Sequence, residues 1–137
     1  MLLYQECHIV GNKTNGLIVG SQYHMNIKKQ DLRNISMTRL NTIVERLQQG
    51  ETVTWRPQGN SMTPRILSGE QVTVEPITKE TTLEVNDVVY AKVAGSVYLH
   101  LISAIQDGRY QISNNHGHIN GWTSRDKIYG KLINICP

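Results

Sequence analysis

The sequence predicts a mainly β protein, folded as a compact antiparallel barrel or sandwich. From residue 51 onward the chain consists of short runs rich in Val, Ile, Thr and Tyr, which are the residues that favour pleated strands. Turns containing Gly, Asn or Asp separate these runs at close spacing, as in antiparallel all-β folds. The chain has 137 residues, a length typical of one domain.

The first 50 residues lack this regular series of short β-rich runs, so we divide the chain into an N-terminal extension, residues 1–50, and a β domain, residues 51–137. In the extension, Val10 and the apolar residues 17–19 flank the polar run GNKTNG. Two short apolar stretches around such a run predict a hairpin. We expect this extension to pack on the β domain.

One amphipathic helix is expected within residues 31–50. Apolar residues recur there at spacings of three, four or five and fall near one helical face. Asp31 and Asn34 are the two candidates for its N-cap, because their side chains accept backbone N–H bonds. Gly50 occupies the position where helices commonly end in a left-handed residue.

Six strands are expected in the β domain, at residues 51–57, 70–77, 87–93, 96–105, 109–113 and 127–135. Turns are expected between the runs, at Ser68-Gly69, Asn86-Asp87, Ala94-Gly95, Asp107-Gly108 and Asn120-Gly121.

Charge and hydropathy exclude several functions. The net charge of +3 is too small to demand a nucleic-acid partner. No apolar run approaches the roughly 20 residues that cross a bilayer, and the N-terminus does not resemble a secretory signal. We therefore expect a soluble, cytoplasmic protein. Cys7 and Cys136 lie near opposite ends of the chain, so we interpret them as ordinary buried thiols rather than a disulfide framework.

The run Gly59-Asn60-Ser61-Met62-x-Pro64 is the most informative stretch for function. Gly59 gives the backbone the freedom to present a hydroxyl, and Pro64 stiffens the exit from the turn. Taken alone, this pattern indicates only a turn that contains a serine.

Several stretches in order carry a family resemblance: GNSMTPRILSGEQVTVEPI, LEVNDVVYAKV, SVYLHLISAI, YQISNNHGHINGW and IYGKL. They resemble the ordered boxes of the signal peptidase and LexA-type repressor peptidase superfamily, over about residues 52 to 135. The resemblance implies a coiled β-fold and a serine peptidase whose base is Lys or His. The chain looks most like small phage or bacterial members, without the membrane anchor of signal peptidases.

The resemblance also implies roles for individual residues. Ser61 takes the place of the nucleophile and His100 that of its general base, and neutral imidazole suits this role near neutral pH. The oxyanion site would use the Ser61 backbone N–H with help from Gly59 or Asn60. Three further groups are expected to support the dyad: Asn114 and Asn115, which stand where the family has Gly-Asp, and Asp87. Met62 and Pro64 of the Ser-Met-x-Pro box are expected to contact substrate.

Two departures keep a second function open. Leu101 follows His100 where the family usually has Arg, and an Asn at 114 or 115 can orient an imidazole but cannot stabilise imidazolium as a carboxylate does. The main hypothesis is a peptidase with a Ser61/His100 dyad. The alternative is a catalytically silent module of the same fold that binds a protein partner.

The expected partner is therefore a peptide or protein, as substrate or ligand, and a homodimer stays open because an unpaired edge strand invites a second copy. A nucleic-acid regulator is a third, disfavoured hypothesis. We expect no cofactor and no metal, although His116 and His118 form an H-x-H pair that His100 would have to complete. Trp122 is expected to pack as a hydrophobic plug, with base stacking as the alternative.

Overall fold

The computed structural model describes residues 7–10 and 39–137. In this part of the chain, eight strands form one antiparallel sheet in the order β2-β3-β8-β4-β5-β6-β7, with β1 paired to β8 outside this path. The strands are β1 (His8–Ile9), β2 (Val53–Trp55), β3 (Gln71–Pro76), β4 (Val88–Val93), β5 (Ser96–Gln106), β6 (Arg109–Ser113), β7 (Ile119–Ser124) and β8 (Ile128–Cys136). A helix, α3 (Arg39–Gln48), and a 3-10 turn, η3 (Arg125–Lys127), complete the described elements. The predicted mainly antiparallel β fold with a short helix is confirmed.

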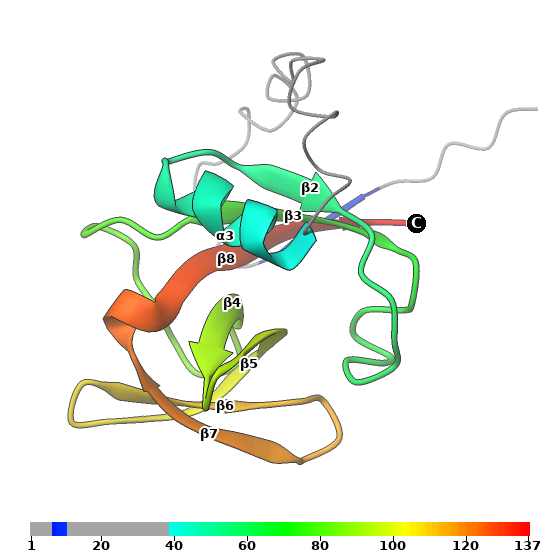
Figure 1. Cartoon of the computed structure of the whole chain (residues 1–137). Coiled ribbons are helices and arrows are strands. Elements are labelled where there is room, and N and C mark those ends of the chain that lie inside the picture. The colour runs from blue at the N-terminus through cyan, green and yellow to red at the C-terminus, as the bar shows by residue number, and fades with distance from the viewer. Residues whose placement is uncertain (1–6, 11–38) are drawn as a thin grey trace, which may run out of the picture.

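Strand β8 joins the two halves of the sheet. It runs through the middle of Figure 1, with β2, β3 and α3 on one side and β4 to β7 on the other. Its residues from 130 to 136 pair with β3, and its residues from 128 to 131 pair with β4. Both pairings contain a register shift, and such bulges bend strands. β2 and β7 end the path and do not pair with each other, so the described sheet stays open.

Strand β4 separates two hydrophobic clusters, because successive side chains of a strand point to opposite faces. Val88 and Tyr90 belong to the first cluster, and Val89, Ala91 and Val93 belong to the second. All five are buried. The second cluster is completed by Leu83, Ile102, Ile112 and Ile128.

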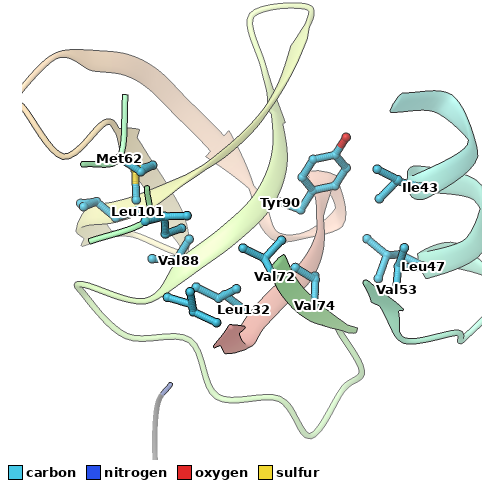
Figure 2. Close-up of a cluster of buried hydrophobic side chains, with 12 residues drawn as sticks. Ile43, Leu47, Val53, Met62, Val72, Val74, Val88, Tyr90, Leu101 and Leu132 are labelled. Atoms are coloured by element: carbon cyan, nitrogen blue, oxygen red, sulfur yellow. The ribbon is translucent and has the colours of Figure 1, made fainter. Parts of the chain in front are cut away.

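The helix closes the first cluster. Ile43 and Leu47, four residues apart on one helical face, are buried together with Val53 of β2 and Tyr90 of β4. Figure 2 shows Ile43 beside Tyr90, and Leu47 beside Val53. Gly50 follows the helix with φ of 89°, so the predicted helix end is confirmed. The predicted start, with Asp31 and Asn34, lies outside the described residues, as does most of the predicted hairpin.

The two tight hairpins follow the predicted turn chemistry. Ala94 and Gly95 between β4 and β5 have φ of 51° and 87°, and Asp107 and Gly108 between β5 and β6 have φ of 51° and 76°. Positive φ at both central residues is what two-residue hairpin turns require, because it matches the twist of the strands. The turns at these two positions are confirmed.

The predicted turn at Asn120-Gly121 is wrong, because both residues lie within strand β7. Gly121 pairs with Ile112 of β6 and has φ of 143°. A Cβ atom there would lie 3.1 Å from the Val93 side chain, so glycine is used for close packing on β4 and not for reversing the chain. The six strands predicted elsewhere in the β domain all form, and β7 is the strand that sequence reasoning missed.

The interpretation of the cysteines is also wrong. Cys7 and Cys136 form a disulfide across 129 residues of sequence. Strand β1 lies antiparallel to β8 with His8 opposite Ile135, which brings the Cα atoms of the two cysteines to 4.1 Å. Distance along the chain therefore gave no guide to distance in space, because the first described strand pairs with the last.

Candidate active site

The segment between β2 and β3, residues 56–70, presents Ser61 to solvent, and we refer to it as the serine segment. Its chain is folded by its own backbone bonds: the Gly69 N–H donates to the Pro57 carbonyl at 2.9 Å, and the Ile66 N–H donates to the Met62 carbonyl at 2.9 Å. Met62 and Ile66 are buried in the first cluster and anchor the segment. Ser61, which directly precedes Met62, remains exposed. The apolar residues thus fix the position of an otherwise surface hydroxyl.

His100 lies opposite Ser61. It stands in the middle of β5, paired with Val89 of β4, and only 7% of its surface is exposed. The Ser61 Oγ lies 3.1 Å from the His100 Nε2. The Tyr98 ring stacks on the imidazole with centroids 4.8 Å apart, which limits rotation of the histidine.

A third side chain, Asn120 of β7, holds the other nitrogen of the imidazole. Its Oδ1 lies 2.7 Å from His100 Nδ1. A side-chain amide oxygen only accepts hydrogen bonds, so Nδ1 carries the proton and Nε2 is left with the lone pair. That lone pair faces the Ser61 hydroxyl, which is the arrangement required of a general base.

Burial keeps the imidazole neutral. Loss of solvent lowers the pKa of His100 below its usual value, and the charge of His118 lowers it further, while the hydrogen bond to Asn120 opposes both effects. The neutral form, which can accept a proton, is therefore the dominant one near neutral pH.

Asn115 contacts the segment around Ser61, and Asn114 contacts the turn that follows β6. The Asn115 N–H donates to the Ser61 carbonyl at 2.9 Å, its Nδ2 donates to the Thr63 carbonyl at 2.9 Å, and its Oδ1 accepts from Arg65 Nε at 3.1 Å. The Asn114 side chain accepts the N–H groups of His116 and His118. The turn after β6 is thereby hydrogen-bonded to the segment that carries Ser61, and we call this set of bonds the clamp.

His116 belongs to the same clamp. Its Nε2 lies 3.0 Å from the Asn60 carbonyl and 3.3 Å from the Thr63 Oγ1. A carbonyl oxygen accepts, so the ring donates to it. Among the described residues, no group of three side chains is placed to hold a metal ion.

Of the backbone donors expected at an oxyanion site, Gly59 is already engaged, since its N–H donates to Ser68 Oγ at 3.0 Å. The Ser61 N–H has no partner within the described part of the chain. The Asp87 side chain contacts other groups: it accepts from the Glu84 N–H at 2.8 Å, and its Oδ2 is 3.4 Å from Lys131 Nζ.

A cleft of about 190 Å³ leads to the dyad. Its walls are mostly apolar side chains from the serine segment and from the start of β5, with both Ser61 and His100 at its surface; the lining residues are Pro57, Gln58, Gly59, Ser61, Met62, Ile66, Leu67, Val97, Tyr98, Leu99 and His100. Met62 is among them, whereas Pro64 is exposed and does not line this cleft.

Comparison with known proteins agrees with this fold and these boxes. The chain matches the Peptidase S24-like family over residues 20–133, and it belongs to that family. The match begins inside residues 1–50, which the boxes alone leave outside the resemblance. A search of curated proteins gives no match. No helix in the described part of the chain is long and apolar enough to cross a membrane.

Asn120 is the residue that sequence reasoning missed at this site. The Asn-Gly pair indicated a turn, and the expected support was assigned to Asn114 and Asn115. The available signal was the position of Asn120 on a strand beside β6, but recognising it required β7 to be predicted first.

Proposed function

We propose that this protein hydrolyses peptide bonds, with Ser61 as nucleophile and His100 as general base. The observation that carries the proposal is the continuous chain of contacts from Ser61 Oγ to His100 Nε2 and from His100 Nδ1 to Asn120 Oδ1. A serine hydroxyl becomes a useful nucleophile when a base accepts its proton, and a third group that orients the base completes this arrangement.

In the proposed reaction, the Ser61 oxygen attacks the carbonyl carbon of the substrate while its proton passes to His100 Nε2. The negative charge develops on the carbonyl oxygen, where the unpartnered Ser61 N–H supports it. His100 then gives the proton to the leaving amine. A water molecule then attacks the acyl carbon while its proton passes to the same nitrogen, and the bond to Ser61 breaks as His100 returns that proton to the serine oxygen.

The substrate is a peptide or protein segment, as membership of the family implies. It would lie in the cleft beside Ser61, where Met62, Leu67 and Leu99 offer apolar contacts. The reaction needs no cofactor, since nucleophile, base and donor all come from the chain.

A second candidate function is supported by the chemistry of Asn120. An amide orients the imidazole but carries no charge to stabilise the imidazolium that forms during attack. A module that binds an extended peptide in the same cleft without cleaving it is the alternative, because main-chain hydrogen bonds can supply affinity without catalysis.

One experiment separates the two functions. The purified protein is incubated with a diverse peptide library, beside Ser61→Ala and His100→Ala variants, and the products are read by mass spectrometry. Cuts that vanish in both variants support the peptidase. If no cut exceeds the background of the variants while peptides are still retained by all three proteins, the binding module is favoured and the peptidase is refuted.

A further inference from the structure

A second cleft lies apart from the dyad, at the edge of the sheet where β7 ends. It has a volume of about 160 Å³ and is formed by β4, its hairpin turn to β5, the start of β6, the end of β7 and η3; its lining residues are Lys92, Ala94, Gly95, Arg109, Trp122, Thr123, Ser124 and Lys127. None of these residues lines the cleft at Ser61. The two clefts are therefore separate candidate sites.

Positive charge is concentrated at this second cleft. Residues 51–137 contain eight Lys and Arg and eight Asp and Glu, so this part of the chain carries no net formal charge. Three of those eight cations, Lys92, Arg109 and Lys127, line the cleft, and no acidic residue does. Within this neutral part of the chain, three positively charged side chains therefore line one small cleft.

The other cations of the domain are mostly occupied by protein oxygens. Arg56, Arg65, Arg125 and Lys131 each bind a carbonyl, amide or carboxylate oxygen. Within the described residues, Lys92 and Arg109 make no side-chain hydrogen bond or ion pair. Lys127 interacts only with the charge of the adjacent Asp126, whose carboxylate binds the Ser124 hydroxyl. The repulsion between the unpaired Lys92 and Arg109, together with the nearby Lys127, would be relieved by an anion.

An aromatic face completes the cleft. Trp122, which the sequence predicted to pack as a hydrophobic plug, keeps 37% of its surface exposed. The strand beneath it is fixed: the Thr123 hydroxyl is buried and donates to the Lys92 carbonyl at 2.8 Å, which ties β7 to β4. An indole held on a rigid strand beside cations offers a stacking surface together with charge.

We propose that this cleft binds a nucleoside phosphate. The base stacks on Trp122, and the phosphate lies among Arg109, Lys92 and Lys127. Guanidinium and ammonium groups both bind phosphate, Arg through paired N–H donors and Lys as a point charge. Base stacking on an aromatic side chain tolerates any base. The same chemistry is offered by a free nucleotide and by one nucleotide of a single strand.

The two indole N–H signals of Trp55 and Trp122 in a ¹⁵N-correlated spectrum provide the assay, with Trp122→Leu assigning them. Inorganic phosphate, adenosine monophosphate and an eight-nucleotide deoxyadenylate are titrated at low salt. We expect the nucleotide ligands to shift the Trp122 signal and leave that of Trp55 unchanged. Trp122→Leu should weaken binding roughly 5- to 150-fold, the range for loss of one stacked base.

Surface variants test the charges without risk to folding. Arg109→Gln and Lys92→Gln should each weaken binding. The matched control is Lys79→Gln, because Lys79 is an exposed lysine outside the cleft and should leave affinity unchanged. For a single strand, the logarithm of affinity falls with the logarithm of salt concentration by about 0.7 per phosphate contacted, so each cleft variant should reduce that slope.

The ligands distinguish the two sources. A steeper salt dependence and tighter binding for the eight-nucleotide strand than for the monophosphate assign the cleft to single strands, whereas equal affinity assigns it to free nucleotides. The proposal is overturned if Trp122 does not respond at low salt or if inorganic phosphate binds as tightly as the monophosphate. It is equally overturned if Lys79→Gln weakens binding as much as Arg109→Gln.

Discussion

Breaking the Cys7–Cys136 disulfide should destabilise the protein strongly. The bond closes a loop of 129 residues, and cross-linking a loop of that length lowers the entropy of the unfolded chain by an amount worth about 5 kcal/mol at 25 °C. Measured disulfides often give less, so we expect a loss of about 2 to 5 kcal/mol in the free energy of unfolding. For 137 residues, the unfolding entropy is about 0.29 kcal/mol/K, which converts this loss to a fall in Tm of about 7 to 17 °C.

The assay compares thermal unfolding of the oxidised protein with that of a Cys7→Ser/Cys136→Ser double variant, and of both proteins in reductant. Reductant should lower the Tm of the wild type to that of the double variant and leave the double variant unchanged. Equal Tm values for oxidised wild type and double variant would refute the reasoning.

The same pair of thiols also tests the expected cytoplasmic location. Disulfides persist in oxidising compartments and are rare where thiols are kept reduced. Alkylation of the protein in intact cells should find Cys7 and Cys136 reduced if the location is the cytoplasm. An oxidised pair would place the protein elsewhere.

The remaining predictions concern the site and the core. Because burial lowers the pKa of His100, the base is neutral above that pKa, so kcat/KM should be flat near neutral pH and fall only when pH drops below about 6.5. Asn120→Asp should move this acid limb of the pH profile to higher pH, since a carboxylate favours imidazolium. An unchanged acid limb would show that the residue at position 120 does not affect the titration of His100. Asn115→Ala removes two side-chain hydrogen bonds from the serine segment and should cost about 1 to 2 kcal/mol in urea unfolding and reduce kcat, while stability and kcat equal to wild type would contradict the clamp. Gly130→Ala should destabilise by about 1 to 3 kcal/mol, since its Cβ would lie 3.0 Å from the Glu75 carbonyl and 3.1 Å from Leu47 Cδ1; an unchanged urea midpoint would show that the core can relax there.

The local sequence was a good guide to the fold. Alternating or continuous β-branched runs predicted β3, β4, β5, β6 and β8. In β4, burial on both faces corresponds to the nearly continuous apolar run from Val88 to Val93. The turns at Ala94-Gly95 and Asp107-Gly108 were predicted from local sequence, because the positive φ of two-residue hairpin turns favours Gly and Asp.

Contacts between distant segments were harder to predict. Gly121 indicated a turn, although its lack of a side chain serves packing against Val93. That misreading concealed β7, and with it the approach of Asn120 to His100. The disulfide was missed for a related reason, because only the pairing of β1 with β8 brings Cys7 to Cys136.

At the candidate site, the sequence singled out Ser61 and His100 through a resemblance and not through local physics. The two residues are 39 positions apart in the sequence, and nothing between them indicates that they are close in space, which depends on how the serine segment folds against β5. Asn115 was expected to serve the histidine, whereas it binds the segment around Ser61.

The most direct test of the central proposal is whether His100 activates Ser61. A serine-reactive fluorophosphonate is added to the wild type and to Ser61→Ala, His100→Ala and Ser96→Ala variants, and intact mass is followed with time at neutral pH. Ser96 is the matched control, because it is an exposed serine at the start of β5 that does not line the dyad cleft.

We predict one adduct per chain on Ser61 in the wild type and in Ser96→Ala, none in Ser61→Ala, and a rate at least about 100-fold lower in His100→Ala, since general-base catalysis contributes about 10² to 10⁴. A wild type that does not react, or one that reacts no faster than His100→Ala, would contradict the proposed peptidase dyad.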